Sequence, residues 1–240
     1  MPNQAFRCFV DNVLNDNIGK RVVRFEYSGQ VYWLKQAEKL TGAMRFLKPN
    51  SKKSIQIEID TLKKLALKGA PVPTLMYCGD HFLVIADVGK TLNEWMANAN
   101  IESNTQQQIL VDSGVALAKL HTLGLAHGRP ALRDISWQDG QVSFIDFEAS
   151  QNNKSIIYQQ RRDILVYIHS LYRYLGPKHE SIKPVIMAYR HAGGDNIWQE
   201  AKKWITPWQC LYFVLYCLKD VGGKDLRPIY WLLWHFRQTK

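Results

Sequence analysis

Apolar and polar positions alternate along residues 21–36 and are interrupted at Ser28-Gly29. Two runs rich in β-branched and aromatic residues around such a pair are typical of a β-hairpin. Residues 74–78 and 82–86 are two further short apolar runs with turn residues between them, and they predict a second hairpin. The beginning of the chain is therefore expected to be rich in β-structure.

A helical pattern separates the two hairpins. Residues 37–53 are polar and basic and predict a loop. After that segment Ile55, Ile59, Leu62 and Leu65 recur at spacings of three and four. This is the period of a helix with one apolar face.

The pattern becomes mostly helical from Asn104 onward, apart from an interruption at 126–150. A β-rich part followed by a helical part indicates an α+β protein with two lobes. We place the β-rich lobe at 1–87 and the helical lobe at 88–240.

Composition narrows the class of protein. Of 240 residues, 46% are hydrophobic and 22% are charged, which is ordinary for a folded globular chain. The longest uncharged apolar stretch near the C-terminus, 205–218, has 14 residues, fewer than the about 20 that a membrane span needs. The four cysteines lack CxxC spacing, and no export signal is visible at the N-terminus. We expect a cytoplasmic protein.

The charge balance is basic and evenly spread. There are 31 Lys and Arg against 21 Asp and Glu, a net charge of +10. Proteins that recognise nucleic acid concentrate basic residues in a stripe or patch, so no specific nucleic-acid partner is expected. The excess favours anionic partners, namely phosphorylated substrates, nucleotides or an acidic membrane surface.

The most distinctive stretch lies within the interruption at 126–150. A loop holds His127 and continues to a tight turn at Asp139-Gly140. An apolar strand then leads to Asp146. An acid at the end of a buried strand suits metal coordination by oxygen ligands.

These residues, taken with two earlier ones, resemble a known family. Lys35 at the end of a hairpin strand, Glu58 on a helix, the His127-Gly loop and Asp146 occur in the order of the protein-kinase fold. The segment ending at Lys35 is most similar to the bacterial lipopolysaccharide core (heptose/Kdo) kinases. The resemblance covers about residues 19–175. It implies a bilobal protein-kinase-like fold with ATP and Mg²⁺ as cofactors. The small β-rich N-terminal lobe, 1–87, would bind the nucleotide, and the helical C-terminal lobe, 88–240, would be the catalytic and substrate-binding lobe.

Lys35 and Glu58 are expected to form an ion pair. Trp33 and Lys35 share one strand face, and Glu58 borders the apolar face of its helix, where an unpaired carboxylate is costly. The resemblance implies that Lys35 binds ATP phosphates and pairs with Glu58; a surface lysine and a solvated glutamate are the alternatives. Trp33 occupies the place of a small residue beside adenine, so it either stacks on the base or fills its pocket.

The resemblance also assigns the metal ligands and the catalytic loop. Asp146 matches the acid of the Asp-Phe-Gly turn, with Glu148 in place of the glycine. Asp134, which lies 12 residues before Asp146, matches a metal-binding asparagine, and both acids suit Mg²⁺. Arg129 occupies the position of the catalytic base in the loop of His127, and a guanidinium cannot accept a proton.

Two assignments remain open. In a second register Asp134 is the base and Asp139 the metal ligand, although Asp139-Gly140 is typical of a turn. Residues 161–163 open a predicted helix, and the resemblance implies that Asp163 braces the catalytic loop by accepting backbone hydrogen bonds. The alternative is an acid favoured by the helix dipole.

The C-terminal part is dense in aromatic residues with cations nearby: Trp198, Trp204, Trp208, Tyr212, Phe213, Tyr216, Tyr230, Trp231, Trp234, Phe236, with Lys202, Lys203, Arg227 and Arg237. Such a stretch either packs in the protein core or lies at a membrane interface. A peripheral contact with the inner membrane surface is therefore one of two alternatives.

Two functions are compatible with these residues. The first is an ATP- and Mg²⁺-dependent phosphotransferase whose acceptor is an anionic sugar or lipid, such as a lipopolysaccharide-core hydroxyl. The second is a pseudokinase that acts as a binding or regulatory module. Arg129 and Trp33 favour the second function, whereas the joint presence of Lys35, Glu58 and Asp146 favours the first.

Overall fold

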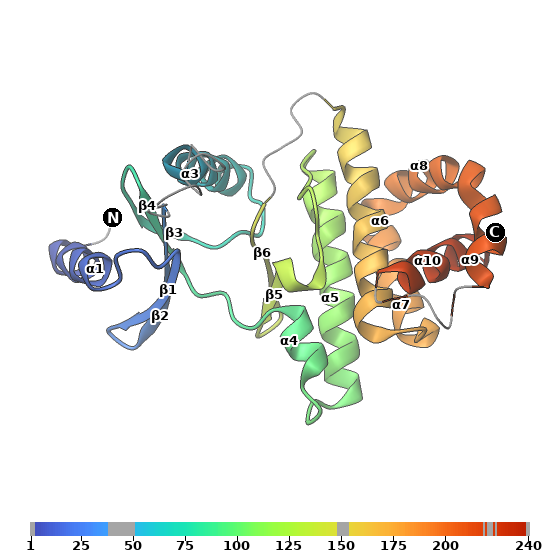
Figure 1. The fold of residues 1–240 in the computed structure, drawn as a ribbon, viewed down its shortest axis with the longest axis horizontal. Coiled ribbons are helices and arrows are strands. Elements are labelled where there is room, and N and C mark those ends of the chain that lie inside the picture. Colours follow the sequence, from blue (N-terminus) through green and yellow to red (C-terminus); the bar gives the residue numbers. More distant parts are fainter. Residues whose placement is uncertain are drawn as a thin grey trace. The chain divides into compact units, whose positions relative to one another are not determined.

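The computed structural model divides into two compact units, Met1–Val88 and Gly89–Lys240. The sequence places this division one residue earlier. The structure describes residues 3–37, 51–147, 154–217, 219, 223 and 225–238. The chain is an α+β protein, with an antiparallel sheet in the first unit and a mostly helical second unit (Figure 1).

The first unit is built around a four-stranded sheet with the strand order β1-β2-β4-β3. Both predicted hairpins and the predicted helix are confirmed. Positions 38–50 of the predicted loop lie outside the described residues, and its last three positions, 51–53, are wrong because they already belong to the helix. The elements of this unit are α1 (Gln4–Asp16), β1 (Val22–Tyr27), β2 (Gln30–Gln36), α3 (Ser51–Leu67), β3 (Leu75–Cys78) and β4 (Phe82–Ala86).

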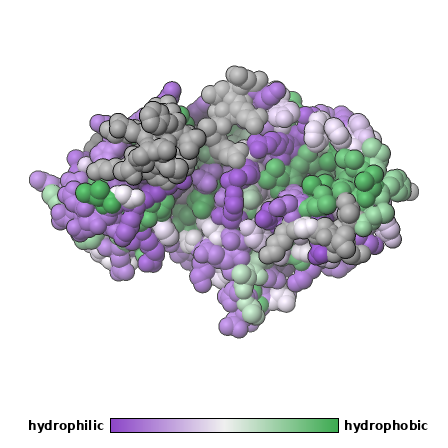
Figure 2. Space-filling view, viewed as in Figure 1, coloured by the Kyte–Doolittle hydropathy of each residue, from purple (hydrophilic) through white to green (hydrophobic). Residues whose placement is uncertain are grey.

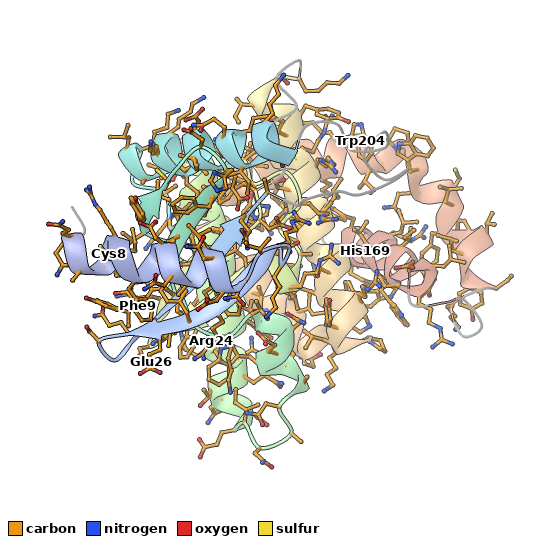
Figure 3. The ribbon with its side chains drawn as sticks, turned by 60° about the vertical axis from the view of Figure 1, so that its left-hand side comes forward. Cys8, Phe9, Arg24, Glu26, His169 and Trp204 are labelled. Carbon is orange, nitrogen blue, oxygen red and sulfur yellow. The ribbon has the colours of Figure 1, made fainter. Side chains whose placement is uncertain are left out.

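A helix covers each face of this sheet. On β2, Tyr32 and Leu34 pack with Phe6 and other residues of α1. Trp33, which points to the opposite face, packs against a cluster that includes Ile59 of α3. Figure 3 labels Phe9 on α1, whose ring lies near those of two β1 aromatic residues. Lys35 therefore belongs to the face that α3 covers.

The second unit contains two long helices, α5 and α6, a short hairpin and a set of C-terminal helices. Its elements are α4 (Leu92–Ala97), α5 (Ser103–Thr122), η1 (Leu132–Asp134), β5 (Ile135–Gln138), β6 (Gln141–Phe144), α6 (Ile156–Leu175), α7 (His179–Tyr189), η2 (Arg190–Gly194), α8 (Asp195–Ile205), η3 (Thr206–Cys210), α9 (Leu211–Tyr216) and α10 (Leu226–Gln238). No helix of the described ranges is long and apolar enough to cross a bilayer.

Hydrogen bonds between α5 and α6 fix where the following loop begins. The side-chain amide of Gln160 donates to the carbonyls of His121 and Leu125 at 2.7 and 2.8 Å. The first of these carbonyls belongs to the last turn of α5, where carbonyl groups lack an N–H donor within the regular helix. The buried pair of Ser113 and Tyr167, whose oxygens lie 2.5 Å apart, links the same helices further along. The loop after α5 thus starts from a fixed point.

Candidate active site

The first unit contains the expected ion pair. Nζ of Lys35 on β2 lies 2.5 Å from Oε1 of Glu58 on α3. Both side chains are largely shielded from solvent, which strengthens a charge-assisted hydrogen bond. The predicted pairing of these two residues is therefore confirmed, and it fixes the lysine on the α3 face of the sheet.

Trp33 is held in place on the same face. Its indole N–H donates to Oδ1 of Asp87 at 2.5 Å, and its ring packs against the apolar cluster beneath α3. The backbone N–H of Asp87 donates to the carbonyl of Val31, so the acid is itself anchored to β2. Sequence reasoning missed Asp87, although an acid directly after the apolar run of β4 was a visible signal.

In the second unit, Asp163 braces the loop that follows α5. Its carboxylate is fully buried and accepts hydrogen bonds from the backbone N–H groups of His127 and Gly128 at 2.6 and 2.9 Å. This confirms the expected contact. The position of the residue in its helix was predicted wrongly, because α6 begins at Ile156 behind a Ser155 cap. Asp163 is thus inside the helix, and the interpretation as a helix-start acid is wrong.

Ser170 braces the same loop one step further along α6. Its hydroxyl accepts a hydrogen bond from the backbone N–H of Leu132 at 2.9 Å. Asp163 and Ser170 are seven positions apart and therefore lie on one face of the helix. Together they hold both ends of the loop that contains Arg129.

The ring of His127 is buried and joins two backbone segments. A carbonyl can only accept, so Nε2 of His127 donates to the carbonyl of Ile145 at 2.9 Å. Nδ1 then accepts the backbone N–H of Arg129 at 3.2 Å. This ring connects the loop directly to the residue that precedes Asp146.

The hairpin of β5 and β6 brings Asp134 and Asp146 to its open end. The backbone N–H of Ile145 donates to the carbonyl of Asp134 at 2.9 Å. The two carboxylates are near enough for the charge of Asp146 to raise the pKa of Asp134. Asp134 and Asp146 thus lie at the same end of the hairpin within the second unit.

Asp139 lies at the other end of this hairpin. It has φ 49° and Gly140 has φ 81°, the pair of left-handed residues that a two-residue type I′ turn needs. Its side chain is exposed. The second register, which made Asp139 a metal ligand, is therefore wrong.

The carboxyl of Asp134 is almost completely buried between cations. Nε of Arg133 lies 3.5 Å and Nε of Arg129 3.9 Å from its Oδ2 atom. Burial raises the pKa of Asp134, the charges of the two guanidinium groups lower it, and the charge of Asp146 raises it further. Among the described residues Oδ2 has no hydrogen-bond partner with good geometry. Sequence reasoning gave Arg133 no role, and its position next to Asp134 was the available signal.

Asp146 has an unusual backbone. It has φ 58°, a left-handed conformation that is strained for a residue other than glycine. Such strain gathers at functional sites, where surrounding structure maintains it. Its side chain is exposed, whereas Glu148 lies outside the described residues.

The donor set fits a Mg²⁺ ion that also binds a phosphate. Asp134 offers a buried oxygen without a hydrogen-bond partner in the described part of the chain, and Asp146 offers an exposed carboxylate. No group of three or more potential ligand side chains is found over the described ranges. Mg²⁺ commonly binds through one or two carboxylates, with phosphate oxygens and water completing the shell.

Comparison with known proteins places the chain in a family. The sequence profile of the lipopolysaccharide kinase (Kdo/WaaP) family matches residues 13–183, more than two thirds of the chain. The chain belongs to the Kdo/WaaP family. The Kdo/WaaP match includes every candidate site residue, from Trp33 to Asp163. The helices α8 to α10 lie beyond it.

Two individual proteins are similar to this Kdo/WaaP family member. A Haemophilus influenzae Rd protein of uncharacterized function is 38% identical over 231 residues, which cover 96% of this chain and 95% of the relative. A solved structure from Ralstonia eutropha JMP134, provisionally assigned as an aminoglycoside phosphotransferase, covers 98% of both chains at 12% identity with a TM-score of 0.49. The second similarity is too distant to carry an argument. The Kdo/WaaP match and the α+β architecture together confirm the kinase-like fold.

Proposed function

We propose that this chain is an ATP- and Mg²⁺-dependent phosphotransferase with a sugar or lipopolysaccharide-core hydroxyl as acceptor. The observation that carries the proposal is the proximity of Asp134 and Asp146 at the open end of the β5–β6 hairpin. Among the described residues, the buried Oδ2 of Asp134 has ion pairs with Arg129 and Arg133 but no hydrogen bond of good geometry, which supports its use by an external group. Membership of a kinase family supports the reaction class.

Lys35 is the phosphate-binding residue of the proposal. An ammonium is a compact charge that suits phosphate oxygens, and Glu58 holds it at 2.5 Å on a defined strand face. Trp33 lies on that same face, with its indole N–H bound to Asp87. Its fixed ring offers the flat apolar surface on which a nucleobase stacks.

Asp134 and Asp146 are the proposed metal ligands. When bound, Mg²⁺ neutralises charge on the phosphates of ATP. Asp146 is exposed and therefore accessible to a hydrated ion, whereas Asp134 is nearly buried. His127 is a positioning residue in this proposal, because its ring ties the loop to the carbonyl of Ile145.

The transfer step requires little help from a catalytic base. The acceptor oxygen forms a bond to the γ-phosphorus, the bond to the bridging oxygen breaks, and ADP leaves with the electron pair. The acceptor proton passes to solvent or to a phosphoryl oxygen. Because the transition state is loose, positioning and charge neutralisation supply most of the catalysis. Arg129 supplies a permanent positive charge for the transferring group or for an anionic acceptor.

A pseudokinase is the second candidate function, and one contact favours it. Nε of Arg129 lies 3.9 Å from Oδ2 of Asp134. A guanidinium at this place partly neutralises the carboxylate that a metal ion would use. A chain that binds nucleotide without transferring phosphate is the expected behaviour of this alternative.

Thermal unfolding of the full chain with ATP, in the presence and absence of Mg²⁺, tests the proposal. We expect Mg²⁺–ATP to raise the unfolding temperature of the parent. Lys35→Met should abolish most of this shift, whereas Lys63→Met on an exposed position of α3 should keep it. Absence of any nucleotide effect on the parent would refute both functions. Nucleotide binding without phosphate transfer to a panel of sugar and lipopolysaccharide-core acceptors would favour the pseudokinase.

A further inference from the structure

The C-terminal region carries an uncharged, largely apolar segment that the described part of the chain covers only in part. Residues 206–217, which form η3 and α9 and end one residue beyond α9, contain no Asp, Glu, Lys or Arg. No residue of η3 or α9 is buried. Phe213 and Val214 are 63% and 62% exposed. Helices that are apolar all round are ordinarily buried, so an external partner is expected to cover this one.

The segment has a fixed attachment on one side. The ring of Tyr212 stacks on that of Tyr230 of α10 at 5.0 Å, and their hydroxyl oxygens lie 3.1 Å apart. The exposed large apolar side chains of this region are those that we call the aromatic surface: Trp204, Trp208, Leu211, Phe213, Val214 and Tyr216. Figure 2 shows hydrophobic residues gathered over α8 to α10, and Figure 3 labels Trp204.

Cations lie over the rings of the aromatic surface: Arg161 is 5.2 Å from the ring centre of Trp204, Lys219 is 4.1 Å from that of Tyr216, and Arg237 is 5.1 Å from that of Phe213. Within the described part of the chain, none of these three forms an ion pair with a carboxylate. Aromatic side chains together with nearby Lys and Arg are the composition of protein surfaces that lie in the headgroup region of a bilayer.

We propose that the aromatic surface docks on an anionic phospholipid bilayer. The exposed rings enter the headgroup region, and Arg161, Lys219 and Arg237 lie beside lipid phosphates. Since α9 is far shorter than a membrane span, the segment lies on the bilayer.

Charge decides between a bilayer and a second copy of the chain. Pairing two aromatic surfaces would bring the same three cations together, on chains with a net charge of +10 each. Such repulsion opposes self-association. An anionic lipid surface instead attracts each of these cations.

This proposal does not depend on the phosphotransferase assignment. The helices α8 to α10 lie beyond the residues that match the Kdo/WaaP family. No member of the aromatic surface belongs to the candidate active site. The experiments on bilayer binding and on nucleotide binding can therefore give independent outcomes.

Co-sedimentation of the full chain with vesicles tests the proposal. We expect binding to vesicles of phosphatidylglycerol and phosphatidylcholine in equal parts, and weak binding to phosphatidylcholine alone. Phe213→Ser should weaken partitioning by about tenfold, and Val214→Ser should act in the same direction. Lys219→Gln should weaken binding by about fivefold to the anionic vesicles only. Added salt should reduce the effect of the charge variant.

Matched controls come from the first unit. Leu67 at the end of α3 is 89% exposed, and Lys68 is its exposed neighbour. Leu67→Ser and Lys68→Gln should leave vesicle binding unchanged. Thermal unfolding checks that every variant is folded. We expect that they are, because the altered side chains are exposed.

Three results would overturn the proposal. The first is a parent chain that ignores anionic vesicles or binds neutral ones equally well. The second is an equal loss of binding in Leu67→Ser and Phe213→Ser. The third is a dimer by light scattering that Phe213→Ser dissociates, which would assign the aromatic surface to a second copy of the chain.

Discussion

Nε of Arg129 lies 3.9 Å from Oδ2 of Asp134, so the residue at the position of the kinase base contacts a proposed metal ligand. The loop that carries Arg129 is held by Asp163 and Ser170 of α6, and the arginine is therefore placed by structure around it. Its charge either assists phosphate transfer or replaces a metal ion. The two proposed functions differ on this point.

Substitution of Arg129 separates these functions. If the guanidinium stabilises the transferring phosphoryl group, Arg129→Ala should lower ATP turnover at least tenfold, about 1.4 kcal/mol of transition-state stabilisation. Arg24→Ala, on an exposed position of β1, serves as the control. Parental turnover is measured as ADP release with and without acceptors. An inactive parent in which Arg129→Asp gains ATP hydrolysis would identify a pseudokinase.

Asp146→Asn tests the metal ligand. Replacing the carboxylate by an amide removes a charge that Mg²⁺ favours, so the additional stabilisation by Mg²⁺ beyond that by ATP alone should disappear. The measurement is the unfolding temperature at several Mg²⁺ concentrations. Asp139→Asn, at the far end of the same hairpin, should behave like the parent. Equal Mg²⁺ responses in Asp146→Asn and the parent would remove Asp146 from the metal site.

Asp163→Asn should loosen the catalytic loop. The buried carboxylate accepts two backbone N–H groups, and an amide presents a donor to one of them. We expect a loss of about 2–3 kcal/mol in the free energy of unfolding, measured by urea titration. Ser170→Ala, which releases only the N–H of Leu132, should cost about 1 kcal/mol. A loss in Asp163→Asn no larger than that in Ser170→Ala would contradict the bracing role.

His235 should make stability depend on pH. It lies on α10, and its Nδ1 is 3.1 Å from the hydroxyl of Tyr172, which also contacts His179. Burial, followed by the charges of His179 and Lys183, lowers the pKa of His235 from 6.5 to about 4. Between pH 4 and pH 6.5 the unfolded chain therefore binds a proton at His235, whereas the folded chain does not. The free energy of unfolding should have its full value above pH 6.5 and should fall by up to about 3 kcal/mol as the pH drops towards 4.

Unfolding titrations at pH 7 and pH 5 measure this effect. His235→Gln keeps a polar group next to Tyr172 but does not titrate, so its stability should change less between the two values of pH. An unchanged pH dependence in His235→Gln would assign the effect to other groups.

Local patterns in the sequence predicted the elements well. The alternation in 21–36 and the spacing of Ile55, Ile59 and Leu62 depend on short-range periodicity, which burial on one face imposes. The ion pair of Lys35 and Glu58 was accessible too, because each residue lies on an inward face of a recognisable element.

Contacts between distant segments were less accessible. The bond from Trp33 to Asp87 spans 54 positions and depends on the pairing of β2 with β4. The start of α6 was placed too late because its first residues show no apolar stripe: Ile156 and Ile157 are adjacent and both exposed. The available signal was polar: Gln160, Asp163 and Ser170 recur at helical spacing and are all buried. Buried polar groups at that spacing indicate that a helix holds a loop by hydrogen bonds.

The helix α1 has a consequence for synthesis of the chain. Phe6 and Val10 of α1 pack against a sheet core that includes Phe82 and Val84 of β4. At a ribosomal rate of about 5–20 residues per second, α1 emerges several seconds before β4 exists. During that interval only the β1–β2 hairpin is available to cover the apolar face of α1. Full burial of α1 therefore waits for β4, and a nascent chain stalled before β4 leaves part of this helix exposed to chaperones.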